Sequence, residues 1–242
     1  FSSYEEMVFL KMGRYTYTPE DLAVFRRQVC EHVVPICEKL FENQRQRLGI
    51  DTLHYYDESI VFPDGNAMPI GTTQELLKKA GKMYREISKE TGDFFDFMLE
   101  YDLFDLETRN GKQQGGYCTT FPDYKAPFIF SNFNGTDADI DVLTHEAGHS
   151  FEAYEAMRRI PLTEQTFSTS EVAEIHSMSR EFFTYPWMEL FFGEHAEKYR
   201  KSHLWDALEC VPYMACVDEF QHRVYEEKLF DAMERRKVWS EL

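Results

Sequence analysis

The feature that most constrains the fold is a long helical pattern near the start of the chain. Its apolar residues recur with a period of about 3.6, the repeat of one face of an α-helix. They are Leu22, Phe25, Val29, Val33, Ile36 and Leu40. Thr18 and Pro19 suit the start of such a helix, and Gly49 suits its end. The pattern predicts a helix over residues 18–48, with Pro35 as the point where it can kink.

Helical patterns fill most of the remaining chain. A second helix is predicted from a cap at Thr72 or Thr73 and continues through Leu77 and Met83. Further helices are predicted over residues 93–103, 137–158, 170–183 and 198–233. No repeat, low-complexity tract or linker separates these segments. We therefore expect a mainly α fold, organised as one mostly helical domain over residues 1–242.

The segment over residues 115–135 breaks the helical pattern. It begins with paired glycines and contains two prolines, Pro122 and Pro127. Two β-prone pieces, residues 117–121 and 128–131, lie on either side of the prolines. This composition predicts a small β-hairpin or an edge strand.

Charge and cysteine usage narrow the class of protein. Against 26 Lys and Arg stand 43 Asp and Glu, a formal net charge of -17 that repels nucleic acid and anionic membranes. No apolar run approaches the roughly 18 residues of a membrane-spanning helix, and the first residues do not resemble an export signal. Five cysteines without a CxxC spacing indicate neither a disulfide framework nor a thiolate zinc site. We expect a cytoplasmic protein with no nucleic-acid or membrane partner.

The strongest chemical motif is HExxH, formed by His145, Glu146 and His149 within the predicted helix over residues 137–158. A spacing of four places both imidazoles on one helical face, where they can bind one zinc ion. Glu146 lies beside them and can contact a zinc-bound water. The competing interpretation is that both residues are ordinary helix histidines and the motif is coincidental.

A catalytic zinc site needs a third protein ligand and one open position. The predicted helix over residues 170–183 offers three acidic residues, Glu171, Glu174 and Glu181. A carboxylate on a second helix packed across the first is the gluzincin arrangement. The alternative HExxHxxGxxH pattern is excluded, because position 155 is Glu. Spacing alone does not choose among the three carboxylates.

Several segments together resemble the M3 peptidases, specifically the oligoendopeptidase F branch. They are residues 115–119, 128–136, 141–149, 174–178 and 217–222. The resemblance implies that His145, His149 and Glu174 bind one Zn²⁺ per chain and that Glu146 is the general base. His176 and Glu181 would then be partners that orient the ligands, although an exposed carboxylate or a packed histidine is the plain alternative.

By the same resemblance, the segment over residues 117–136 would line the substrate channel. Its candidate substrate contacts are Tyr117, Phe130, Asn132 and Gly135, and a short peptide could pair along it as an added strand. The plain alternative is a hairpin that covers the core.

The resemblance implies a multi-helix gluzincin-type core that acts as a zinc-dependent endopeptidase on short peptides. Family members are usually more than twice as long and carry a His and Tyr cluster further along, which has no equivalent before Leu242. We therefore expect a catalytic-core portion of a longer peptidase. Two alternatives stay open: a truncated zinc- or peptide-binding helical domain without activity, and a related HExxH carboxypeptidase.

Overall fold

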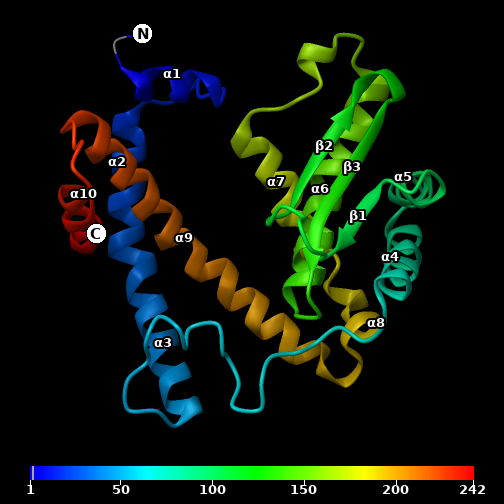
Figure 1. The fold of residues 1–242 in the computed structure, drawn as a ribbon, viewed down its shortest axis with the longest axis horizontal. Helices are drawn as coiled ribbons and strands as arrows, with labels where there is room; N and C mark the ends of the chain where they lie inside the picture. The colour runs from blue at the N-terminus through cyan, green and yellow to red at the C-terminus, as the bar shows by residue number, and fades with distance from the viewer. Residues whose placement is uncertain (2) are drawn as a thin grey trace. The chain divides into compact units, whose positions relative to one another are not determined.

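The computed structural model describes residue 1 and residues 3–242, which form helices and one small sheet (Figure 1). The mainly α fold expected from the sequence is confirmed. The chain divides into two compact units, residues 1–65 with 202–242, and residues 66–201. Helix α9 (Ala196–Glu226) contributes residues to both units. The expectation of a single domain stays a prediction.

The first unit contains the long helical pattern as two helices, α2 (Pro19–Gln28) and α3 (Val34–Leu48). Between them the backbone forms a π-helical segment, Val29–Val33, just before Pro35. Proline has no N–H, so it cannot continue the hydrogen-bond ladder at this point. Thr18 caps α2 in a reciprocal capping box, and Gly49 ends α3 in the left-handed conformation. Both helix ends are therefore as predicted.

Helix α1 (Tyr4–Lys11), which the periodicity did not predict, also belongs to this unit. The helix expected over residues 198–233 is interrupted: α9 ends at Glu226 and α10 (Ala232–Glu241) follows. The physical reason is a new cap, because the Asp231 side chain accepts the N–H groups of Met233 and Glu234.

The second unit begins with α4 (Thr73–Ile87) and α5 (Lys89–Glu100), which pack on each other. Thr72 caps α4 as predicted. Helix α5 starts four residues earlier than expected, because Ser88 ends α4 and its hydroxyl also accepts the N–H of Thr91. Both helices supply fully buried aromatic and sulfur-containing side chains to the core of this unit.

A three-stranded sheet follows, in the order β1-β3-β2. Strand β2 (Tyr117–Phe121) pairs antiparallel with β3 (Ala126–Phe133), so the predicted hairpin is confirmed. Strand β1 (Phe104–Glu107), which was not predicted, pairs parallel with the other side of β3. Strand β2 therefore has a free edge.

The sheet lies against α6 (Ala138–Arg159), which also packs against α7 (Ser170–Phe183) (Figure 1). The short helix α8 (Met188–Phe192), further along the chain, adds buried side chains to the same core. Completely buried side chains from α4, α5, β3, α6 and α8 form one cluster; they include Met83, Phe94, Phe95, Ile129, Ile140, Leu143, Met188 and Phe191. Because α6 contributes to this cluster, its orientation is fixed by the core.

Candidate active site

The HExxH residues lie in the middle of α6. Leu143 and Ala147 are completely buried and hold one face of the helix in the core. His145 and His149 lie on the neighbouring face and are half-buried, with ring centroids 4.9 Å apart. The core thus positions both imidazoles at a surface that α7 covers in part.

Helix α7 approaches α6 most closely at Gly148. A Cβ atom added there would lie 2.6 Å from Ser177 Cα and 2.8 Å from the carbonyl oxygen of His176. Such separations are shorter than any ordinary carbon contact, so only glycine fits between the two backbones. The glycine inside the motif therefore sets how near the second helix can come.

This approach brings Glu174 to the histidines. Its Oε2 atom lies 3.3 Å from His145 Nε2 and 3.6 Å from His149 Nε2, and the Ser177 hydroxyl donates to the same oxygen at 2.8 Å. All three ligand atoms lie within 4.8 Å of one another. Tetrahedral zinc with bonds of about 2.0–2.1 Å requires ligand separations of about 3.3–3.4 Å. The donor set therefore fits zinc in both composition and spacing.

Glu181, on the same helix as Glu174, contacts the other ring nitrogen of His145. Its Oε1 atom is 2.6 Å from His145 Nδ1, and the side chain is largely buried. A proton on Nδ1 would be donated to this carboxylate, which leaves Nε2 unprotonated and facing Glu174. Burial acts to lower the pKa of His145, but the hydrogen bond to Glu181 and the surrounding carboxylates offset this effect, so the pKa is raised.

Glu146 is buried beside the histidines, with 8% of its surface exposed. Burial raises its pKa, whereas His145 and the nearby main chain of Cys118 on β2 act in the opposite direction. An added Cβ at Gly116 would lie 3.8 Å from Glu146 Oε1, so the start of β2 is close to this carboxylate. A carboxylate with a raised pKa is suited to accept and return a proton near neutral pH.

Burial lowers the pKa of the His149 imidazole, whereas it raises the pKa of the Glu146 carboxylate. A neutral imidazole is the form that binds a metal ion. The electrostatic environment of His149 therefore agrees with the role of a ligand.

A cleft of about 460 Å³ opens beside these residues. Its lining includes β2 from Tyr117 to Thr120, together with His145, Glu146 and His149. Phe167 also lines the cleft and is 76% exposed. The cleft is thus bounded by a strand with a free edge, which can add a further strand.

The structure separates the four candidate substrate contacts. Tyr117 lines the cleft, whereas Phe130, Asn132 and Gly135 are not among its lining residues. Phe130 stacks under Tyr117 with ring centroids 4.8 Å apart. Asn132 and the Gly135 N–H make hydrogen bonds to a loop and to Asp139, respectively. Direct contact of these residues with substrate stays a prediction.

His176 is exposed on α7, and its ring makes no hydrogen bond within the described part of the chain. Its backbone, rather than its imidazole, contacts the region of Gly148. Sequence reasoning did not single out Gly148 or Ser177. The only linear signal was a glycine inside a helix, which often marks a close approach of backbones.

A mainly helical core with two histidines and a glutamate converging from adjacent helices, and a sheet edge across the cleft, defines an HExxH-type peptidase site. The chain belongs to peptidase family M3, whose sequence profile matches residues 1–242. The resemblance seen in the motifs is therefore confirmed. Peptidases of this family are metallopeptidases.

Solved structures agree with this assignment. PZ peptidase A with inhibitor 2 is 53% identical with a TM-score of 0.96, over 99% of this chain and 42% of that one. A Bacillus anthracis str. Ames protein assigned as an oligoendopeptidase F is 48% identical with a TM-score of 0.96, over 100% of this chain and 44% of that one.

A curated relative gives a more distant match. The oligoendopeptidase F homolog of Lactococcus lactis subsp. lactis (strain IL1403) is 27% identical over 137 residues, which are 57% of this chain and 22% of the relative. The chain thus spans less than half of the length of these relatives. Within residue 1 and residues 3–242, no helix has the length and apolar character needed to cross a bilayer.

Proposed function

We propose that this chain carries the catalytic core of a zinc-dependent endopeptidase that hydrolyses short peptides. The observation that carries the proposal is the convergence of His145, His149 and Glu174 beside Glu146. Membership of family M3 supports peptide hydrolysis as the reaction. The proposed cytoplasmic location rests on the cysteine pattern alone.

His145, His149 and Glu174 would hold one zinc ion per chain. When bound, zinc polarises a carbonyl group and lowers the pKa of a water molecule. Glu181 keeps the His145 ring in the orientation and tautomer that present Nε2, and Ser177 holds the Glu174 carboxylate through its hydroxyl.

Glu146 performs the proton transfers in this proposal. Its carboxylate accepts a proton from the attacking water and then donates it to the leaving amine of the cleaved peptide. The pKa raised by burial favours the first step, because it makes the carboxylate a stronger base toward the attacking water.

The substrate would lie along β2. Thr120 is paired with Pro127, which has no N–H, so this pair cannot exchange two hydrogen bonds. Because residues alternate along an antiparallel pair, the main-chain groups of Cys118 and Thr120 face the cleft. An extended peptide can therefore add to this edge, with Tyr117 as a side-chain contact. Such binding through the peptide main chain favours cleavage within a chain over a carboxypeptidase, which must recognise a terminal carboxylate.

The decisive experiment measures metal content and turnover separately. Purified protein is analysed for zinc and assayed with an internally quenched peptide, beside His149→Ala and Glu146→Gln variants. We expect about one zinc per chain, lost in His149→Ala and kept in Glu146→Gln, whose turnover falls by about 10²–10⁴-fold. Ordinary turnover by Glu146→Gln would overturn the assignment of the general base. Zinc binding without turnover in the unaltered chain would favour a metal- and peptide-binding domain.

A further inference from the structure

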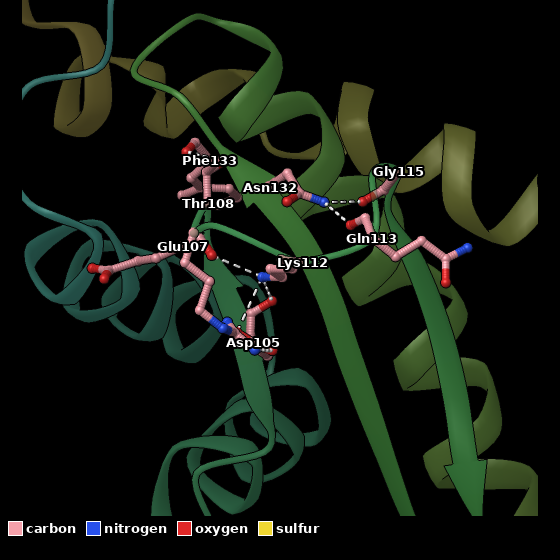
Figure 2. A network of polar contacts seen from close by, with 9 residues as sticks. Asp105, Glu107, Thr108, Lys112, Gln113, Gly115, Asn132 and Phe133 are labelled. Carbon is pink, nitrogen blue, oxygen red and sulfur yellow. Dashed lines mark hydrogen bonds and ion pairs between the residues drawn. The ribbon is translucent and has the colours of Figure 1, made fainter.

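The loop between β1 and β2, residues 108–116, has no regular secondary structure, yet its polar groups are tied to the sheet (Figure 2). Lys112 makes the first tie. Its side chain is 1% exposed, and Nζ donates to the main-chain oxygens of Asp105 and Glu107, both at 2.9 Å. It also donates to Asp105 Oδ1 at 3.0 Å. A buried ammonium group is stable only when it has such hydrogen-bond and charge partners. These partners therefore hold the loop residue Lys112 against β1.

The Lys112 ammonium group also contacts an aromatic ring on β3. Lys112 Nζ lies 4.4 Å from the ring centroid of Phe130 on β3. The Phe130 ring in turn stacks on Tyr117 at an interplanar angle of 14°. Tyr117 is the first residue of β2 and lines the cleft. Lys112, Phe130 and Tyr117 therefore form one continuous series of contacts from β1 to the first residue of β2.

Asn132 makes the second tie. Its Nδ2 atom donates to the carbonyl oxygens of Gln113 and Gly115, at 2.8 and 2.9 Å (Figure 2). Both hydrogens of the amide are thus used to hold the loop on β3, immediately before β2 begins. A side chain lacking these donors would leave two loop carbonyls without these partners.

The held loop leads directly to the proposed general base. At Gly116 an added Cβ would lie 3.0 Å from Val142 Cγ1, so the loop already contacts α6. The same added Cβ would lie 3.8 Å from Glu146 Oε1, and Cys118, two residues later, lines the cleft together with Glu146. A shift of the loop would therefore move both the strand edge and the main chain that borders this carboxylate.

We infer that Lys112 and Asn132 are positioning residues, a clamp that holds the start of β2 against Glu146. This inference rests on the proposed function and assigns Asn132 a role through the loop rather than through contact with substrate. It also explains why a fully buried lysine is present in an exposed connection between two strands.

The test compares Asn132→Ala and Lys112→Met with Arg109→Met. Arg109 is a matched control because it lies on the same loop and pairs with the same Asp105, but its side chain is 58% exposed. The first readout is hydrogen–deuterium exchange of residues 113–120 in the zinc-loaded protein. We expect exchange to become about 10-fold faster or more in both clamp variants, since each loses at least two hydrogen bonds, and to stay unchanged in Arg109→Met.

The second readout is peptide hydrolysis with zinc content measured on the same samples. We expect kcat to fall by about 10–100-fold, the effect of a displacement of about 1 Å at an active site, with zinc content retained and KM raised as well, because the peptide-binding edge moves with the loop. Unchanged exchange would overturn the clamp, as would faster exchange with normal kcat. A rise in KM alone, without faster exchange, would identify Asn132 as a substrate contact instead. If the unaltered protein has no turnover, the proposed function fails, and the exchange measurement still decides whether the clamp exists. Asn132→Ala leaves the buried charge pair intact, so it serves if Lys112→Met does not fold.

Discussion

Replacing Gly148 by alanine perturbs the contact on which the proposed metal site depends most. The added Cβ would lie 2.6 Å from Ser177 Cα. Ordinary carbon–carbon contacts are about 3.5–4.0 Å, so α7 must retreat by about 1 Å. Glu174 lies one turn before Ser177 on the same helix and would move with it.

The magnitude follows from two opposing effects on stability and one on metal binding. Overpacking costs about 1–3 kcal/mol, and the better helix propensity of alanine offsets about 1 kcal/mol. The net loss of stability is therefore about 0–2 kcal/mol, which lowers Tm by about 2–4 °C for each kcal/mol. Metal sites tolerate displacements of about 0.2 Å, so a retreat of about 1 Å weakens zinc binding by about 10–100-fold or more.

The assay is zinc affinity by chelator competition, together with thermal unfolding of the metal-free protein. Gly81→Ala is the matched control. Gly81 is also a buried helical glycine in this unit, but an added Cβ would meet only side-chain atoms, the nearest being Leu99 Cδ1 at 3.2 Å. We expect this control to keep the zinc affinity of the unaltered protein. Equal zinc affinity in Gly148→Ala would refute the reasoning that this glycine sets the approach of α7.

Two further predictions concern groups around the site. Glu181→Gln removes the charged partner of His145 Nδ1, so zinc affinity should fall by about 10–100-fold in the same chelator assay, and an unchanged affinity would contradict an orienting role. Burial raises the pKa of the Cys118 thiol to about 11, against the opposing hydrogen bond from Ser150. Its alkylation by iodoacetamide, followed by peptide mass analysis, should be slow at pH 7 and accelerate about tenfold per pH unit up to about pH 10, with the exposed Cys30 modified first. A rate at Cys118 that does not change with pH would contradict this.

The sequence predicted those features that are encoded locally. The starts of α2 and α4 and the end of α3 were found because Thr18, Thr72 and Gly49 act on their own neighbouring backbone groups. The hairpin of β2 and β3 was found for the same reason, since its strands are separated by a short turn. The mainly α class follows from the same local patterns.

Features that depend on distant partners were missed. Strand β1 has four residues and is stabilised by parallel pairing with β3, with Phe104 opposite Ile129. Nothing within Phe104–Glu107 distinguishes such a strand from a loop. The interruption between α9 and α10 was missed because the apolar pattern continues across the break, and the cap at Asp231 was not weighed against it.

The candidate site also combines features that local sequence predicts with features that depend on the folded structure. The spacing of His145, Glu146 and His149 is sufficient to place them together on one helix. The choice of Glu174 over Glu171 came only from the family resemblance, because it depends on where α7 crosses α6. That crossing point is set by the contact of Gly148 with Ser177, which exists only in the folded protein.

All the proposed zinc ligands, with Ser177 and Glu181, come from α6, α7 and the connection between them. The strand that would bind the peptide belongs to an earlier stretch of the chain. Under the proposed function, metal binding and peptide binding would therefore be encoded in separate, contiguous parts of the chain. Substitutions in residues 117–121 would then change the peptide-binding strand, and through it the surroundings of Glu146, without replacing any of the three proposed metal ligands, so selectivity could diverge while the metal site is retained.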